Sequence, residues 1–200
     1  QKLGHTTIAT ILQCSGNGRG FFAHKVRGSQ WKTGAAACVL WTGVPVKAVV
    51  DACGGIASGA VFMTSSGVDH APTGLDPKKA MVERSVPKKA YKDAILAWEM
   101  NGDPLPNSHG GPLRTITPGY FGINNVKHVG KLSFTDKESD VKYMKSSYRI
   151  SPIGKKGSQY PTCWEMPVKS WITRPTDETG TVKAGKVQIV GVAMGGTKKA

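Results

Sequence analysis

The fold is decided by one stretch of the sequence, Ile8-Ala9-Thr10-Ile11-Leu12-Gln13-Cys14-Ser15-Gly16-Asn17-Gly18-Arg19-Gly20. A β-branched apolar run ends at Cys14 and turn-forming residues follow, so the pattern predicts a strand with a thiol at its end. Arg19 places a fixed cation within a few residues of that thiol. A nearby cation lowers the pKa of a thiol, and a thiolate is both a nucleophile and a soft metal ligand. A lone cysteine on a strand is also often a small buried hydrophobic residue, and the spacing leaves that alternative open.

The composition indicates a β-rich chain with an anionic partner. A length of 200 residues suits one or two domains, and 25 glycines and 12 prolines suit many short strands and loops. The net charge of +14 predicts nucleic acid, a lipid surface or a small anion as partner. No basic motif interleaved with aromatic residues is present, which disfavours nucleic acid. The cysteines show no zinc-site spacing, and no apolar run approaches the ~20 residues of a membrane helix.

The alternating apolar runs predict a succession of short strands. We expect strands over residues 5–14, 60–63, 95–100, 127–134, 168–173 and 187–193. Asn101-Gly102 is typical of a two-residue hairpin turn. The last two strands cannot hold a core by themselves, so we expect that unit to pair with something outside it or to continue past Ala200.

Helix and loop signals fill the segments between these strands. Residues 41–45 resemble a helix start, and the apolar positions that follow at helical spacing place Cys53 in the core. Polar residues predict a loop over 64–74. Lysines together with two prolines predict a surface loop or a short helix over 76–90.

A second group of polar residues lies on glycine-rich loops in the middle of the chain. His109-Gly110-Gly111-Pro112-Leu113-Arg114 joins an imidazole and a guanidinium across a tight turn, and Asn124-Asn125-Val126-Lys127-His128 follows it. These side chains suit a phosphate or another oxyanion, because Arg and Lys supply charge and glycine exposes backbone N–H groups. A solvated loop with unrelated charges is the alternative that the residues leave open.

Several motifs then occur together in one order. They are Gln13-Cys14-Ser15-Gly16-Asn17 with Arg19, Trp41-Thr42-Gly43-Val44-Pro45, Gly67-Val68-Asp69, Met100-Asn101-Gly102 with Leu105-Pro106, His109-Gly110 with Pro112 and Arg114, and Val126-Lys127. With these motifs the chain closely resembles the molybdenum domain of the sulfite oxidase family from about residue 6 to 195, and within it the bacterial sulfite dehydrogenases. The resemblance implies an α+β fold. A mixed, β-rich molybdenum domain over 1–160 would be followed over 161–200 by the beginning of an immunoglobulin-like β-sandwich that serves dimerisation.

The resemblance also assigns roles to residues. It implies that the sulfur of Cys14 binds molybdenum. It makes Arg19 and Tyr148 the catalytic residues, with Arg19 holding the anionic substrate and Tyr148 forming hydrogen bonds near the oxygen ligands of the metal. The residues implied to hold the molybdopterin cofactor and its phosphate are Asp69, His109, Arg114, Asn125, Val126 and Lys127. Pattern and spacing alone mark the thiol, the nearby cation and the anion-binding loop, but they do not name molybdenum.

The sequence departs from the family pattern in three respects. Gly18 stands where vertebrate and plant members carry an arginine, so one positive charge beside the metal ligand is missing. Family residues that would precede position 1 and most of the dimerisation domain are absent, and we expect the natural protein to be longer. No haem-binding region and no CxxCH motif are present, so we expect no haem in this chain and electron transfer to a separate protein.

The function implied by the resemblance is the oxidation of sulfite to sulfate, with electrons passed singly to a separate c-type cytochrome. We further expect a homodimer or a complex with a cytochrome subunit, no nucleic-acid partner, no membrane span, and a location in the periplasm. One alternative is another oxo-transfer reaction on the same scaffold, such as oxidation of sulfane sulfur; reduction of nitrate or of oxidised methionine fits less well. The other is a basic β-rich module without enzyme activity that binds phosphate or nucleic acid.

Overall fold

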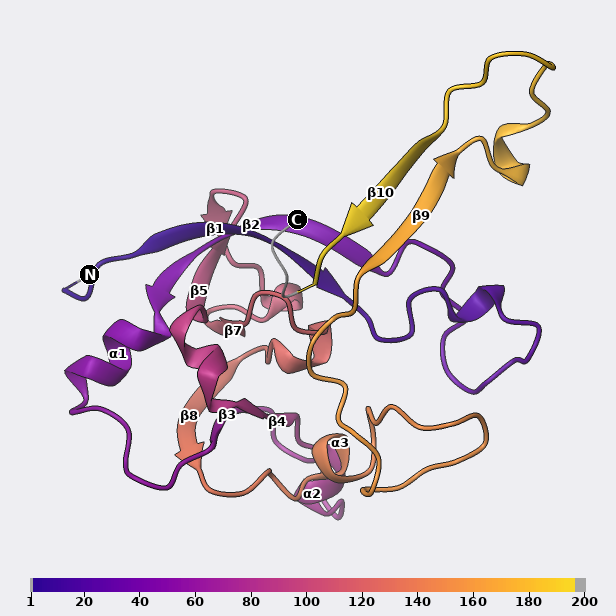
Figure 1. The fold of residues 1–200 in the computed structure, drawn as a ribbon. Helices are drawn as coiled ribbons and strands as arrows, with labels where there is room; N and C mark the ends of the chain where they lie inside the picture. Colours follow the sequence, from indigo (N-terminus) through magenta and orange to yellow (C-terminus); the bar gives the residue numbers. More distant parts are fainter. Residues whose placement is uncertain (1, 197–200) are drawn as a thin grey trace.

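The computed structural model describes residues 2–196, which form three antiparallel β-sheets connected by short helices (Figure 1). The first sheet consists of β1 (Thr6–Gln13), β2 (Ala36–Pro45), β5 (Ile95–Met100), β6 (Asp103–Pro104) and β7 (Arg114–Ile116). Its strand order is β1-β2-β5-β6, and β7 also pairs with β5. The second sheet consists of β3 (Phe62–Gly67), β4 (Glu83–Pro87) and β8 (Val129–Thr135), in the order β4-β3-β8. The third is a hairpin of β9 (Lys169–Arg174) and β10 (Val190–Met194).

Short helical segments connect the strands within the described residues. The α-helices are α1 (Val46–Ala52), α2 (Pro77–Ala80) and α3 (Lys142–Lys145). The 3-10 turns are η1 (Arg19–Phe21), η2 (Lys88–Lys92), η3 (Asn107–His109), η4 (Gly122–Asn124) and η5 (Asp177–Thr179). Strand residues outnumber helical ones, so the predicted mixed, β-rich α+β class is confirmed. Between residues 2 and 196 no helix has the length and apolar character needed to cross a membrane.

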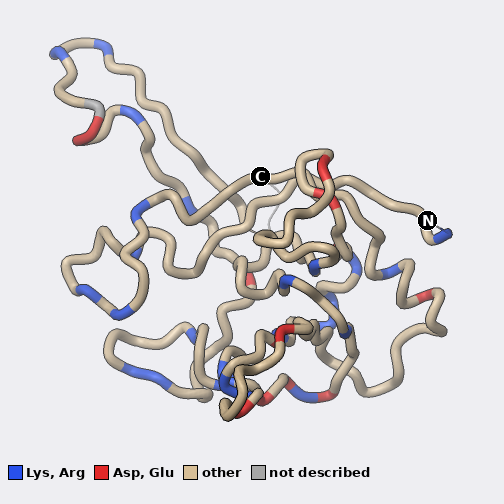
Figure 2. The backbone as a smooth tube through the Cα atoms, turned by 180° about the vertical axis from the view of Figure 1, so that it is seen from behind, with Lys and Arg blue, Asp and Glu red and all other residues tan. Residues whose placement is uncertain are grey.

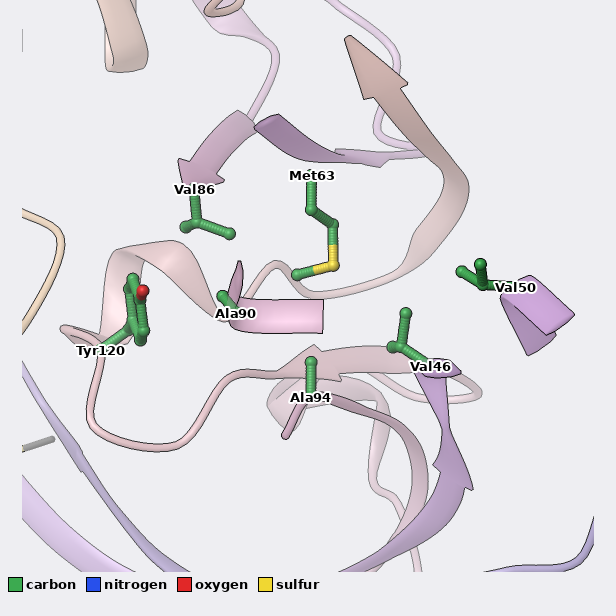
Figure 3. Packing of buried hydrophobic residues seen from close by; sticks show 7 residues of the cluster. All are labelled: Val46, Val50, Met63, Val86, Ala90, Ala94 and Tyr120. Carbon is green, nitrogen blue, oxygen red and sulfur yellow. The ribbon is translucent and has the colours of Figure 1, made fainter. Parts of the chain in front are cut away.

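The main core lies between the second sheet and the segments α1 and η2 (Figure 3). It consists of Val46, Val50, Met63, Val86, Ala90, Ala94 and Tyr120. Met63 projects from β3 toward Ala90 and Ala94 and is fully buried. Burying a side chain of this size contributes about 1.5–3 kcal/mol, so the cluster fixes the second sheet against the first. A second cluster on the first sheet is centred on Trp41, which is 1% exposed.

The second sheet contains polar strand residues that the sequence pattern assigns to a loop. The predicted loop over 64–74 is wrong for Thr64, Ser65 and Ser66, which belong to β3 and are buried. The hydroxyl oxygens of Thr64 and Ser85 lie 2.8 Å apart. Hydrogen bonds between neighbouring strands let polar side chains take interior positions, which a polarity pattern does not reveal.

The prediction of a surface loop or a short helix over 76–90 also needs correction. The short helix α2 is present, but the buried strand β4 follows it. Arg84 of β4 is 1% exposed. Its Nε and Nη2 donate to Asn124 Oδ1 at 3.0 and 2.9 Å, and its Nη1 donates to the carbonyl oxygen of Tyr143. Burial lowers the pKa of the guanidinium to about 10, so Arg84 stays charged at neutral pH. Because each of its nitrogens has an acceptor, this charged side chain is tolerated in the interior.

The helix expected near Pro45 is confirmed, with different ends. Residues 41–45 continue β2, and the helix α1 begins only after Pro45. The predicted core position of Cys53 is wrong, because α1 ends at Ala52 and Cys53 caps it with an exposed side chain. Gly54, with φ of +89°, turns the chain away at this point.

The hairpin predicted at Asn101-Gly102 is present, and the last two predicted strands pair with each other. Asn101 and Gly102 have φ values of +55° and +88° and join β5 to β6, as expected of this turn. The two strands β9 and β10 pair with each other and project from the body of the molecule (Figure 1). The division at residue 160 and the assignment of 161–200 to an immunoglobulin-like sandwich stay predictions; residues 197–200 of that unit lie outside the described part.

Candidate functional site

The turn after β1 presents Cys14 at the end of the first sheet. The N–H of Cys14 donates to the carbonyl of Ala35 at 2.9 Å, and its own carbonyl accepts from the N–H of Asn17 at 3.0 Å. The N–H of Gly16 approaches Cys14 Sγ at 3.4 Å. Cys14 is exposed, so it is not a core residue, and its sulfur is available to a ligand.

Arg19 folds back over the same turn. A side chain at Gly16 would bring its Cβ within 2.6 Å of Arg19 Nη2, so a glycine there makes room for the guanidinium. Arg19 Nη1 donates to the carbonyl of Ser29 at 3.2 Å. The buried Asn17 fixes the turn from below, because its Nδ2 donates to Gln13 Oε1 at 3.2 Å and its Oδ1 accepts from the N–H of Ala35. The cation predicted near the thiol is therefore held over the Cys14 turn.

Tyr148 reaches this region from the segment after α3. Its backbone has φ of +54°, a left-handed conformation, and its carbonyl accepts from the N–H of Cys163 at 2.8 Å. The guanidinium of Arg84 lies 5.8 Å from the centre of its ring. Burial raises the pKa of the Tyr148 hydroxyl, and the proximity of Cys14 adds to this effect. The hydroxyl is therefore protonated at neutral pH and can donate a hydrogen bond.

Cys14, Arg19 and Tyr148 line one open pocket of about 1260 Å³. Three segments far apart in sequence form its walls: the loop that follows η1, residues 147–151, and the stretch 163–168 that leads into β9. In Figure 1 these three segments lie on the side from which the hairpin projects. The structure thus brings together the two predicted catalytic residues and the predicted metal ligand.

Positive charge is in excess in this pocket. Arg149 is paired with Glu138 at 2.8 Å, whereas Arg19 and Arg27 have no carboxylate partner among residues 2–196. Figure 2 shows Lys and Arg on the loop that follows η1 and on the loop that begins at residues 150–151, which flank the pocket. Uncompensated cations at a pocket mouth attract small anions by their field.

A second cluster is centred on Arg114 in β7. Arg114 is 4% exposed, and its guanidinium lies 4.9 Å from the Trp41 ring centre. Its Nη1 and Nη2 donate to the carbonyls of His109 and Asn125 at 2.6 and 2.9 Å, while its Nε has no partner among the described residues. Burial lowers the pKa of Arg114 to about 10, so it remains a cation at neutral pH. A buried guanidinium bound only to carbonyls has a full charge left to offer to an anion.

Lys127 adds a second cation beside Arg114. Its Nζ donates to the carbonyl of Ser108 at 2.6 Å. Burial, and next the charge of Arg114, lower the pKa of Lys127. The side chain of His109 in η3 is exposed next to this pair. Because the two cations repel each other, a bound phosphate in contact with both would stabilise them.

Asp69 lies beside the Lys127 segment. It follows β3, and the N–H of Val68 donates to the carbonyl of His128 at 2.9 Å. A Cβ on Gly67 would lie 3.2 Å from the carbonyl oxygen of Lys127 and 3.5 Å from Asp69 Oδ2. The predicted cofactor residues His109, Arg114 and Lys127 therefore belong to one cluster, whereas Asp69, beside the Lys127 segment, lines a separate pocket with residues 67–71.

The segment 121–127 connects this cluster to the thiol pocket. Phe121 lines the pocket together with Cys14. A Cβ on Gly122 would lie only 3.3 Å from the carbonyl oxygen of Gln13, so η4 passes against the end of β1. Residues 124–126 of this segment are buried, and its end, Lys127, is exposed, so the chain itself links the wall of the thiol pocket to the cation cluster.

The remaining two predicted cofactor residues serve the chain itself. Asn125 Nδ2 donates to the carbonyls of Tyr120 and Phe121, and its Oδ1 accepts from the N–H of Thr117 at 2.6 Å. Val126 is 2% exposed, and its carbonyl accepts from the N–H of Thr115. Both residues shape the segment that carries Lys127. Their roles toward a cofactor stay predictions and would involve backbone groups.

Two further side chains, one in the pocket and one behind Tyr148, carry no signal in the sequence. Cys163 is a buried free thiol that lines the pocket, and Arg84 supports the ring of Tyr148. Neither belongs to a local motif, because Cys163 stands alone and Arg84 is separated from Tyr148 by a long stretch of chain.

These features describe a domain with an exposed thiol in an open pocket and, at a second place, a pair of neighbouring cations. Within residues 2–196 the buried Nε of Arg114 and the buried Nε1 of Trp41, whose ring lies beside that guanidinium, are without hydrogen-bond partners, as expected where a ligand completes the site. A phosphate-bearing cofactor with a thiophilic metal fits both ends of this arrangement.

Comparison with known proteins identifies the family. Residues 1–143 match the model of the oxidoreductase molybdopterin binding domain. The chain is 33% identical to mitochondrial sulfite oxidase of Rattus norvegicus, over 96% of the chain and 36% of that protein. It is 31% identical to nitrate reductase (NADH) 2 of Phaseolus vulgaris, over 76% of the chain and 18% of that protein. Among solved structures, the sulfane dehydrogenase SoxCD from Paracoccus pantotrophus matches with a TM-score of 0.73 and 27% identity, over 96% of the chain and 47% of that chain.

The chain therefore belongs to the sulfite oxidase family of molybdopterin-binding oxidoreductases, as the resemblance predicted, and its cofactor is Mo-molybdopterin. It spans about a third of the rat enzyme and about half of the SoxCD chain that it matches.

Proposed function

We propose that the protein to which this chain belongs oxidises sulfite to sulfate and passes the electrons singly to a separate c-type cytochrome. The observation that carries this proposal is the single pocket shared by Cys14, Arg19 and Tyr148, with Arg19 unpaired by any carboxylate among the described residues. A protonated hydroxyl and a free guanidinium beside a thiol suit a small oxyanion held at a metal.

Six residues and the thiol would hold the cofactor. Cys14 Sγ would bind molybdenum, and Arg114 and Lys127 would bind the phosphate, with Asp69, His109 and the backbone of Asn125 and Val126 around the pterin. When bound, the cofactor supplies an oxygen atom to the substrate and accepts two electrons. Conversion of sulfite to sulfate consumes one water and releases two protons and two electrons.

The chain itself orients the substrate. Arg19 would bind sulfite oxygens through its guanidinium, and its fixed position over the turn keeps the substrate beside Cys14. The Tyr148 hydroxyl would donate a hydrogen bond to an oxygen on the metal side of the pocket. Preorganised donors of this kind stabilise charge that builds on oxygen in the transition state.

Oxidation of sulfane sulfur is the second candidate. Its support is the structural similarity to the sulfane dehydrogenase SoxCD over nearly the whole chain. A location in the periplasm and assembly as a homodimer or with a cytochrome subunit belong to the same proposal. The family description favours an enzyme over a module that binds phosphate or nucleic acid.

The experiment uses the full-length protein produced in cells that make molybdopterin. Reduction of cytochrome c is measured with sulfite, a sulfane-sulfur substrate and no substrate, and molybdenum is quantified in the same sample. We expect near-stoichiometric molybdenum and sulfite-dependent reduction. A molybdenum-loaded protein that reacts only with sulfane sulfur would select the second candidate. A protein that binds no molybdenum would contradict both.

A further inference from the structure

A lysine from the start of β9 lies against the turn that carries Cys14 and Arg19. Lys169 Nζ donates to the carbonyl oxygen of Asn17 at 2.6 Å. The residue is partly buried, and it has no carboxylate partner within residues 2–196. Figure 1 shows β9 starting beside the end of β1, which places the contact between distant parts of the chain. The described part of the chain therefore leaves its charge without a counterion.

Gly18 leaves space for this ammonium group. A Cβ on Gly18 would lie 3.4 Å from Lys169 Nζ, and Gly18 itself has φ of +92°. The lysine thus sits directly against the residue that precedes Arg19. Pro167 and Val168, immediately before it, line the pocket, whereas Lys169 itself does not. Lys169 therefore contacts the turn and not the interior of the pocket.

Further backbone hydrogen bonds join the turn to the segment that precedes β2. The N–H groups of Gly18 and Gly20 donate to the carbonyls of Lys32 and Trp31 at 2.6 and 2.8 Å. On the β9 side, the Lys169 bond is accompanied by an ion pair of Lys32 with Glu178 at 3.0 Å. That ion pair is largely exposed and contributes little. Of these two interactions between the region of the turn and the C-terminal hairpin, the Lys169 bond is the partly buried one.

We propose that Lys169 is a positioning residue that holds the Asn17–Arg19 turn and supplies a second positive charge for the anionic substrate. The C-terminal hairpin thereby completes the substrate side of the site. This inference rests on the proposed function to the extent that the substrate is a small oxyanion. It assigns to β9 a role in substrate affinity in addition to any role in assembly.

Three substitutions separate the charge from the hydrogen bond. Lys169→Arg keeps both, Lys169→Gln keeps a donor without charge, and Lys169→Met removes both. We expect KM for the oxyanion to rise about tenfold in the Met variant, because the turn that carries Arg19 is no longer held and one positive charge is removed, with a smaller change in kcat. The Gln variant should recover part of the loss and the Arg variant most of it. Lys32→Met is the matched control, since it removes the exposed lysine of the same contact, and its KM should stay within twofold of the parent.

A second measurement does not depend on turnover. Hydrogen–deuterium exchange of peptides covering residues 14–20 should be faster in Lys169→Met than in the parent and unchanged in Lys32→Met. Unchanged exchange and unchanged KM in Lys169→Met would overturn the proposal. A KM that Gln restores as fully as Arg would overturn the role of the charge. If the parent protein oxidises no sulfite, the proposed function fails, and the exchange of residues 14–20 still decides whether Lys169 holds the turn.

Discussion

Two buried arginines occupy different regions of the molecule, and their partners differ. Arg84 in the second sheet and Arg114 at the edge of the first are 1% and 4% exposed, and burial lowers the pKa of each to about 10. Arg84 has an acceptor for every nitrogen, whereas the Nε of Arg114 has none among the described residues. The indole Nε1 of Trp41, whose ring centre lies 4.9 Å from the Arg114 guanidinium, is also unpartnered there. Unsatisfied buried groups beside a cation indicate a ligand site, whereas a cation with an acceptor for every nitrogen indicates a structural role.

The substitution Arg84→Met should have the largest effect, and on folding. It leaves Asn124 Oδ1 and the carbonyl of Tyr143 without their donor in the interior. Two buried acceptors without partners cost about 3 kcal/mol in the free energy of unfolding. For a chain of this length the melting temperature should fall by about 6–12 °C. Calorimetry of the cofactor-free protein checks this, and a fall of less than about 2 °C would contradict the structural role of Arg84.

The substitution Arg114→Met should act more on the cofactor than on folding. It leaves the carbonyls of His109 and Asn125 without a donor, but it also removes a buried charge that lacks a carboxylate partner, so the free energy of unfolding should fall by less than in Arg84→Met. Loss of a charge-assisted contact to phosphate should raise the release rate of the cofactor about thirtyfold. Pterin fluorescence after timed dilution measures this release. Cofactor release as slow as in the parent would contradict a role of Arg114 in binding the cofactor. It would also contradict the functional difference between the two arginines.

The smallest of the expected effects is the change of cofactor affinity with pH. Burial and the charge of Arg114 lower the pKa of Lys127 below 10.5 in the cofactor-free protein, and a bound phosphate favours the charged form and raises it again. Affinity is therefore complete below the lowered pKa and falls as pH rises through it. We expect the fall to begin below pH 10.5, and Lys127→Arg to move it to higher pH. Titration of cofactor retention between about pH 7 and 11 tests both; a parent curve that Lys127→Arg does not shift would contradict the role of Lys127.

The parts of the site that the sequence predicts are those encoded locally. The β-branched run before Cys14 and the turn after it place the thiol at a sheet end, and Arg19 is close in sequence. The position of Tyr148 and the role of the cation cluster follow only from the family resemblance, because their contacts join distant segments. A polarity pattern does not predict the buried strand that contains Thr64, because hydroxyl pairs between strands replace apolar contacts there. The pattern misplaces Cys53 because helical spacing does not say where the helix ends.

The contact of Lys169 with Asn17 shows the same limit. The two residues are 152 positions apart, and nothing in either local pattern indicates that they meet. The turn and the two C-terminal strands are each predictable from local sequence, but their juxtaposition depends on how the sheets are arranged in space.

The central claim is that the sulfur of Cys14 binds the metal of the cofactor. A comparison of two cysteine variants tests it most directly. Cys14→Ser and Cys53→Ser are made in the full-length protein, and sulfite-dependent cytochrome c reduction is measured with pterin and molybdenum content. Both cysteines are exposed, but of the two only Cys14 lines the pocket. We expect Cys14→Ser to retain pterin at the Arg114 cluster and to lose about 99% of the activity or more, while Cys53→Ser keeps the activity of the parent. Activity in Cys14→Ser equal to that in Cys53→Ser would contradict the account.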